Sequence, residues 1–205
     1  MKKAFTLAEV LIVIGIIGVV SAMTIPGLIN KYQKQALESQ LKKSYSTLQQ
    51  VIKLMMAEEG VGNYYDTQLE QYCRYGSGDL CRNTLNKYFK SPKMEYSEAG
   101  FTKTYHGLAC GSYGQGFFEY KDCVTANYTL DYGPGTMVTL FNGSEIFINI
   151  NSHGNFRIDV NGIQKPNTEN LDIFDVQVSD NGTLRFSYGL AKRIIKDGWK
   201  MNYMK

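Results

Sequence analysis

The chain lacks the short motifs that commonly mark an enzyme. It has no G-x-S-x-G, no H-E-x-x-H and no loop that would cradle a phosphate. Its only histidines, His106 and His153, lie far apart, and Glu119 and Asp122 form no recognisable acid–base pair. We therefore expect the protein not to be an enzyme and to require no cofactor.

Cysteine is also sparse, and the C-x-x-C spacing typical of zinc sites is absent. The four cysteines are Cys73, Cys81, Cys110 and Cys123, and all follow the apolar N-terminal segment. If that segment exports the rest of the chain, an even number of cysteines predicts two disulfides, with three possible connectivities. Nearness in sequence favours Cys73–Cys81 and Cys110–Cys123.

The excess of charge is small. The chain has 22 basic and 19 acidic side chains, and Lys2 and Lys3 supply two of the three net positive charges. A nearly neutral remainder gives no general reason to expect nucleic-acid binding. One local exception is a basic C-terminal stretch, which is either a solvated face or a short amphipathic element touching DNA or anionic lipid: Lys192, Arg193, Lys196, Lys200 and Lys205.

A long apolar run carries a single carboxylate, Glu9. The run begins at Phe5 and is about 25 residues long if it ends at Ile29, which is enough to span a bilayer. An acid in the hydrocarbon costs roughly 2.5–3.5 kcal/mol on insertion scales, so such a residue indicates a function. The question is which positive group Glu9 meets.

Two ordinary interpretations leave Glu9 unexplained. The segment could be a secretory signal peptide, with Lys2 and Lys3 before the apolar core and a small-residue cleavage site at Val20-Ser21-Ala22. It could also be a simple anchor that the two lysines hold with its N-terminus inside. Neither accounts for a helical pattern that continues beyond the apolar run.

Residues 4–10, Ala-Phe-Thr-Leu-Ala-Glu-Val, and the apolar run after them resemble the N-terminus of type IV pilins and of type II secretion pseudopilins. The resemblance covers roughly residues 1–59. It implies that a prepilin peptidase removes residues 1–4 by cutting between Ala4 and Phe5, and that Phe5 is then N-methylated. The family strongly prefers glycine before the cut, and Ala4 is the next smallest residue.

The resemblance also implies a function and partners. The chain would be a structural subunit of a type IV pilus-like filament or a type II secretion pseudopilus. Its partners would be other pilin or pseudopilin subunits, the peptidase and an inner-membrane assembly platform. Glu9 would pair with the N-terminal amine of a neighbouring subunit, and such a pair sets one axial register.

The same resemblance implies a location. The precursor would be a single-pass protein of the bacterial inner membrane with an exported C-terminal domain, and it would then join a periplasmic or cell-surface filament. The alternatives are a minor tip or priming pilin that binds a ligand, and a secreted or membrane-anchored binding protein with an ordinary signal peptide.

The helical pattern predicts a helix over residues 5–59 with two halves. Residues 5–29 form the transmembrane and assembly half, and Pro26-Gly27 predicts a kink or local melting. Residues 30–59 form an amphipathic half that stops at Gly60, with charged and amide side chains, Glu38 among them, mostly off the apolar stripe. The stripe consists of Tyr32, Leu37, Leu41, Tyr45, Leu48, Ile52 and Met55.

Residues 60–205 are expected to form an exported, disulfide-bonded domain. Its first part is turn-rich and aromatic, with a short helix near residues 80–89. Residues 136–188 predict a β-meander of four to five strands, with hairpin turns at Asn142-Gly143 and Asn181-Gly182. A long helix packed on one face of such an antiparallel sheet gives an α+β, pilin-like fold.

The connection over residues 159–172 is rich in oxygen-bearing side chains. Calcium prefers such ligands, and Asp159, Asn161 and Asp172 are candidates. The same residue types are also common in long turns, and Lys165 interrupts the set. The sequence therefore leaves both a calcium site and plain turn chemistry open.

Overall fold

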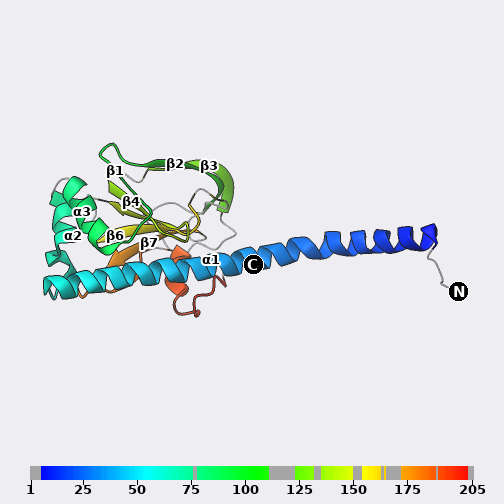
Figure 1. The fold of residues 1–205 in the computed structure, drawn as a ribbon, viewed down its shortest axis with the longest axis horizontal. Helices are drawn as coiled ribbons and strands as arrows, with labels where there is room; N and C mark the ends of the chain where they lie inside the picture. The colour runs from blue at the N-terminus through cyan, green and yellow to red at the C-terminus, as the bar shows by residue number, and fades with distance from the viewer. Residues whose placement is uncertain are drawn as a thin grey trace. The chain divides into compact units, whose positions relative to one another are not determined.

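The computed structural model describes residues 6–75, 78–110, 123–131, 135–149, 154–162, 164, 172–187 and 189–202. A long N-terminal helix, α1 (Leu7–Glu59), precedes two short α-helices and two antiparallel sheets (Figure 1). The chain divides into two compact units, Met1–Ala36 and Leu37–Lys205. The boundary lies within α1, so each unit contains part of this helix, and each is described by itself.

The second unit is a helix packed on a six-stranded antiparallel sheet in the order β1-β4-β5-β6-β7-β8. This arrangement confirms the predicted α+β class with a pilin-like layout. Five of the strands form the expected meander: β4 (Gly135–Thr139), β5 (Glu145–Asn149), β6 (Asn155–Asp159), β7 (Ile173–Val178) and β8 (Leu184–Phe186).

The sheet is larger than predicted, because β1 (Lys93–Ser97) pairs with β4 as an additional edge strand. A separate two-stranded sheet joins β2 (Thr102–Cys110) to β3 (Cys123–Asp131). Strand β1 and the β2–β3 sheet lie in the stretch that we expected to be mainly turns. β1 is polar and only partly buried, so it carries no clear alternation of apolar and polar residues that would mark a strand.

The part of α1 in the second unit buries most of the predicted stripe. Leu37, Leu41, Tyr45, Leu48, Ile52 and Met55 are all buried. Two assignments were wrong. Tyr32, predicted to belong to the packed stripe, is exposed because it precedes Leu37, where the second unit begins. Glu38, predicted to lie off the stripe, is buried on the packed face and has partners from the C-terminal segment.

The end of α1 is fixed by local chemistry. Gly60 has φ +67°, the left-handed conformation that glycine adopts without a steric penalty. The Val61 amide donates to the Met56 carbonyl at 3.1 Å and the Gly60 amide to the Ala57 carbonyl at 3.3 Å. These two bonds form a Schellman motif and confirm Gly60 as the stop.

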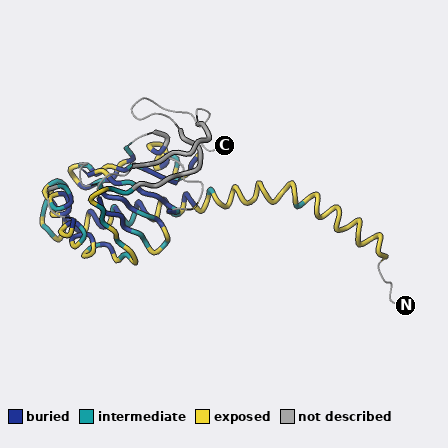
Figure 2. Tube along the Cα trace, turned by 90° about the horizontal axis from the view of Figure 1, so that it is seen from above, coloured by how far each residue is buried: buried dark blue, intermediate teal, exposed yellow. Residues whose placement is uncertain are grey.

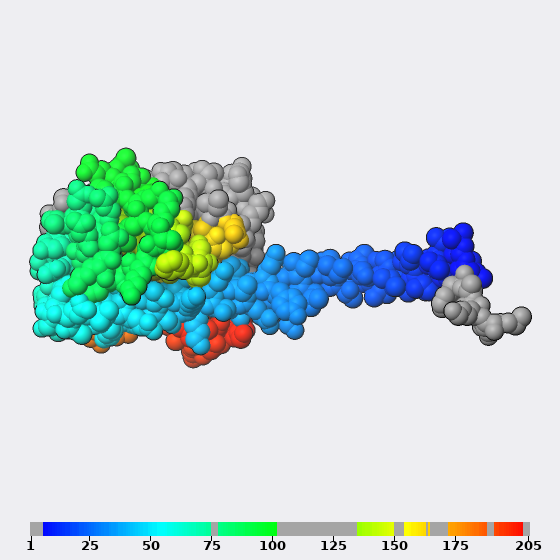
Figure 3. Space-filling view, in the orientation of Figure 1, coloured from blue at the N-terminus to red at the C-terminus, as the bar shows by residue number. Residues whose placement is uncertain are grey.

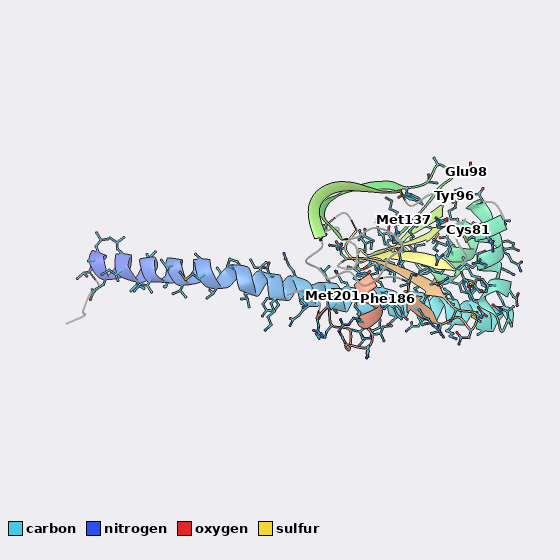
Figure 4. The ribbon with its side chains drawn as sticks, turned by 180° about the vertical axis from the view of Figure 1, so that it is seen from behind. Cys81, Tyr96, Glu98, Met137, Phe186 and Met201 are labelled. Atoms are coloured by element: carbon cyan, nitrogen blue, oxygen red, sulfur yellow. A yellow bond between two sulfur atoms is a disulfide. The ribbon has the colours of Figure 1, made fainter. Side chains whose placement is uncertain are left out.

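The main core lies between the second unit's part of α1 and one face of the sheet. Figure 2 shows buried residues along this unit and exposed residues along the first part of the helix. Ile146, Ile148, Phe156 and Ile158 from the central strands belong to it, as their alternation predicts. The opposite face is also covered at its centre, where Phe101 packs on a second buried cluster of Met137, Phe147 and Ile173. Figure 4 labels Met137 on one side of the sheet and Phe186 and Met201 near α1.

Both predicted Asn-Gly turns are present. Gly143 (φ +82°) and Gly182 (φ +74°) have left-handed backbones in the β4–β5 and β7–β8 connections. A Cβ atom at Gly182 would lie 2.3 Å from the Met56 sulfur, so the second turn packs directly on α1. The turn therefore needs glycine for its backbone, and a side chain at this position would require Met56 to move.

Helices α2 (Gln68–Tyr75) and α3 (Gly78–Tyr88) connect α1 to the sheet. Helix α3 confirms the short helix that we expected near residues 80–89. Cys73 and Cys81 form a disulfide between the two helices, with a Cα–Cα distance of 4.5 Å, and this pairing was predicted. Cys110 and Cys123 are directly opposite each other in the β2–β3 register, but their side chains lie outside what is described, so this disulfide stays a prediction.

Candidate functional site

The first half of α1 is an apolar surface. An 18-residue window of the helix has a mean hydropathy of 2.4, and none of this window is buried. Its large side chains are exposed over every turn, from 43% at Val10 to 78% at Leu7. By length and composition the segment is compatible with a single-pass membrane anchor, and a signal sequence has the same properties.

Glu9 has local partners at the start of α1. Its Oε2 atom accepts hydrogen bonds from the Thr6 amide and from the Thr6 hydroxyl, both at 2.8 Å. The Thr6 hydroxyl in turn accepts a bond from the Glu9 amide at 3.3 Å. This reciprocal arrangement is a capping box, in which the threonine and the glutamate satisfy helix N–H groups that would otherwise have no partner.

The capping box was missed in the sequence analysis, although its signature, threonine followed three residues later by glutamate before an apolar run, is present. Glu9 therefore has a structural role within its own chain, and its role in assembly stays a prediction. Ala4 and Phe5, the predicted cleavage residues, lie outside the described residues.

Pro26 lies inside the helix, and helical structure continues on both sides of it. Local melting at Pro26-Gly27 is therefore not observed. A proline nitrogen cannot donate to the carbonyl four residues earlier, which here belongs to Ala22. A bend at this position stays a prediction.

Glu38 holds the C-terminal segment on α1. Its side chain is 6% exposed, and its Oε1 atom accepts a bond from the Met201 amide at 2.9 Å. Its Oε2 atom is 2.9 Å from the Lys200 ammonium. A buried carboxylate thus has one backbone donor and one cation, which is the pairing that makes burial of a charge tolerable.

Aromatic packing supports the same contact. The Trp199 ring lies 5.1 Å from the Tyr45 ring in an edge-on arrangement, and the Tyr45 hydroxyl donates to the Leu184 carbonyl. Trp199 has φ +66°, an uncommon value for a residue other than glycine. Its amide donates to the Ile194 carbonyl at 2.7 Å, so the strained turn is closed by a hydrogen bond.

A second buried carboxylate, Glu70, lies beside the disulfide. Its Oε2 atom accepts from the Gly154 amide at 3.2 Å, and its Oε1 atom is 4.0 Å from the Arg74 guanidinium. Burial, and then the negative charge of Glu70, raise the pKa of Tyr64 well above its ordinary value of 10.0. The adjacent cavity has about 10 Å³ of room, which one water molecule would fill, so it offers no space for a larger ligand.

The proposed calcium ligands are partly brought together. Asp159 and Asp172 are both buried at the ends of the β6–β7 connection, where the Val160 amide donates to the Asp172 carbonyl. One Asp159 oxygen accepts from the Asn161 amide at 3.3 Å, which is ordinary turn chemistry. Within the described residues no group of three or more His, Cys, Asp or Glu side chains could hold a metal.

Calcium usually takes six to eight oxygen ligands, and residues 165–171 of this connection lie outside the described part. A calcium site at Asp159, Asn161 and Asp172 therefore stays a prediction.

Comparisons with known proteins add no assignment. A scan against protein-family models and searches of curated proteins and of solved structures find no match to the chain.

Proposed function

We propose that the chain is a type IV pilin-like subunit that is processed between Ala4 and Phe5 and assembled into a filament. The observation that carries the proposal is the exposed apolar half of α1 with Glu9 as its single carboxylate. The α+β unit that begins at Leu37 would form the filament surface. In this proposal the function is structural and the protein is not an enzyme.

The disulfide supports export of the second unit. Disulfides such as Cys73–Cys81 form and persist in oxidising compartments and are rare in the cytosol. An apolar segment followed by a disulfide-bonded domain is therefore what a precursor with its C-terminal domain outside the cytoplasm would have. A secreted protein with an ordinary signal peptide has the same two features, and it is the alternative to be tested.

The N-terminus of the mature protein separates the two. Intact mass and N-terminal sequencing of the membrane-associated form should find N-methylated Phe5 as the first residue. A mature chain that starts at Met23 would instead support cleavage after Val20-Ser21-Ala22 and would refute the filament proposal.

The role of Glu9 needs a separate experiment. Glu9→Ala should leave membrane insertion intact and reduce incorporation into filaments, because the carboxylate would no longer meet the amine of a neighbouring subunit. A suitable control is Thr24→Val, since the Thr24 hydroxyl donates to the Val20 carbonyl of its own helix at 2.9 Å. If Glu9→Ala assembles as well as Thr24→Val and the parent, Glu9 does not set the register.

A further inference from the structure

The C-terminal segment, residues 189–202, lies at the end of the second unit where α1 enters it. Contacts along α1 run in the reverse order of the chain: Gln49 bonds to the Gly182 carbonyl and to the Leu184 amide, whereas Glu38 bonds to Lys200 and Met201. Lys200 and Met201 therefore lie beside Glu38, near the start of the part of α1 that belongs to the second unit. Figure 3 shows this segment, in red, next to α1.

This segment presents different residues to the core and to solvent. Ala191, Ile194 and Met201 are buried against the main core. The exposed cationic and aliphatic side chains are Lys192, Arg193, Ile195, Lys196 and Lys200. Lys42 and Lys43 of α1 are exposed within one to two helical turns of Glu38. We call residues 37–45 and 189–202 together the basic end.

The charge of the second unit is strongly separated. The basic end holds six cations and two acids, Glu38 and Asp197, for a formal net charge of +4. Residues 46–188 hold eleven cations and sixteen acids, for a formal net charge of −5. The unit as a whole is nearly neutral, so the overall charge of the chain conceals this separation.

We propose that the basic end docks on an anionic lipid surface, with Ile195 and Trp199 beside the cations at the headgroup level. Tryptophan and exposed aliphatic residues among lysines and arginines are typical of segments that lie in the membrane interface. The inference rests on the proposed function, because it requires the apolar half of α1 to be in a membrane.

Chain length keeps the basic end close to that membrane. If the hydrocarbon ends near Ile29, Glu38 is nine residues away, which is about 14 Å along a helix. The headgroup region occupies roughly 5–8 Å of this distance, and the Debye length in physiological salt is about 8 Å. The cations are thus near enough to attract anionic headgroups.

Lipid fits these residues better than nucleic acid does. The acidic remainder of the unit would repel both an anionic membrane and a DNA duplex. The apolar segment, however, would attach the chain to a membrane and has no comparable attraction for DNA. Lys31, Lys34, Lys42 and Lys43 follow the apolar run, and cations in that position oppose export under the positive-inside rule. Their use in binding the membrane surface offers a reason for their presence.

The test uses Trp199, which is the only tryptophan of the chain. The full-length protein is reconstituted into vesicles of brominated phosphatidylcholine, with and without phosphatidylglycerol, because bromine quenches tryptophan that lies near the lipid. The variant K192Q/R193Q/K196Q removes three cations from the basic end. The control K87Q/K90Q/K93Q removes three exposed cations from the α3–β1 region, so the change in charge is equal.

We expect phosphatidylglycerol to increase quenching of Trp199, and high salt to reverse the increase. Each cation removed should weaken docking about fivefold, so the C-terminal variant should weaken it about a hundredfold while the control behaves as the parent. Equal quenching in the two vesicles would overturn the inference. The inference would also be overturned if K192Q/R193Q/K196Q lost binding to a DNA duplex while lipid still quenched its Trp199 as in the parent.

Flotation of the same vesicles separates the two proposals. If the protein floats with both vesicles but Trp199 is not quenched, the docking inference fails and membrane anchoring stands. If the protein does not float with either vesicle, the anchoring on which the proposed function depends fails as well.

Discussion

Removing the carboxylate of Glu38 should destabilise the second unit and release its C-terminal segment first. In Glu38→Ala the buried Met201 amide loses its acceptor, and a buried group without a partner costs about 1–3 kcal/mol. The Lys200 pair adds little, since the lysine side chain is 56% exposed and such pairs contribute about 0–1 kcal/mol. We expect a total loss of about 2–3 kcal/mol in the free energy of unfolding.

Two further variants define the cause. Glu38→Gln keeps an oxygen acceptor for the Met201 amide without the charge, so it should lose only about 1 kcal/mol. Glu58→Ala removes a glutamate from the same helix, but its side chain is 43% exposed and pairs with Lys87 at the surface. This control should lose less than about 1 kcal/mol.

Urea unfolding of the full-length protein, followed at two signals, measures these changes. Trp199 fluorescence reports the C-terminal segment, because Trp199 contacts Tyr45 of α1, and circular dichroism reports all helices and strands. In Glu38→Ala the fluorescence transition should move to lower urea and precede the circular dichroism transition. If Glu38→Ala and Glu58→Ala unfold alike, Glu38 does not hold the segment and the reasoning is refuted.

Three further predictions concern other parts of the chain. Thr6→Val should remove about 1 kcal/mol of capping free energy, so the first-turn amides of α1 should exchange hydrogen faster, whereas Thr6→Ser should keep their protection. Equal exchange in the two variants would contradict a capping role. Removal of the Cys73–Cys81 disulfide in Cys73→Ser/Cys81→Ser should lower the melting temperature through a loss of about 2–3 kcal/mol in the free energy of unfolding; if this variant and the oxidised parent melt alike, the bond is not structural. The pKa of Tyr64 is raised in the folded protein by burial, so the unfolded chain loses this proton first and stability should fall as pH rises above about 10. Tyr64→Phe should flatten that part of the pH profile, and an unaltered slope would assign it to other groups.

Several features were predictable from sequence because they depend on neighbours in the chain. The apolar run with Glu9, the glycine that ends α1 and the two Asn-Gly turns follow from helix and turn chemistry within a few residues. The Thr6–Glu9 capping box belongs to the same group, although it was overlooked.

Glu38 shows where sequence reasoning stopped. Its spacing to Leu41 and Tyr45, three and seven residues, places it on the apolar face of the helix, but a charged residue there is normally taken to be solvated. Only the fold brings Lys200 and the Met201 amide, more than 160 residues away in sequence, to this carboxylate.

The sequence by itself determined the elements whose stability is local: an exposed apolar helix, its start and end, and the turns of the meander. The tertiary structure alone decided which residues face each other across the fold, including the edge strand β1, the second buried cluster around Phe147 and the position of the C-terminal segment, residues 189–202, beside α1. The physical reason is that these contacts join distant parts of the chain, where burial and pairing depend on partners that no local pattern specifies.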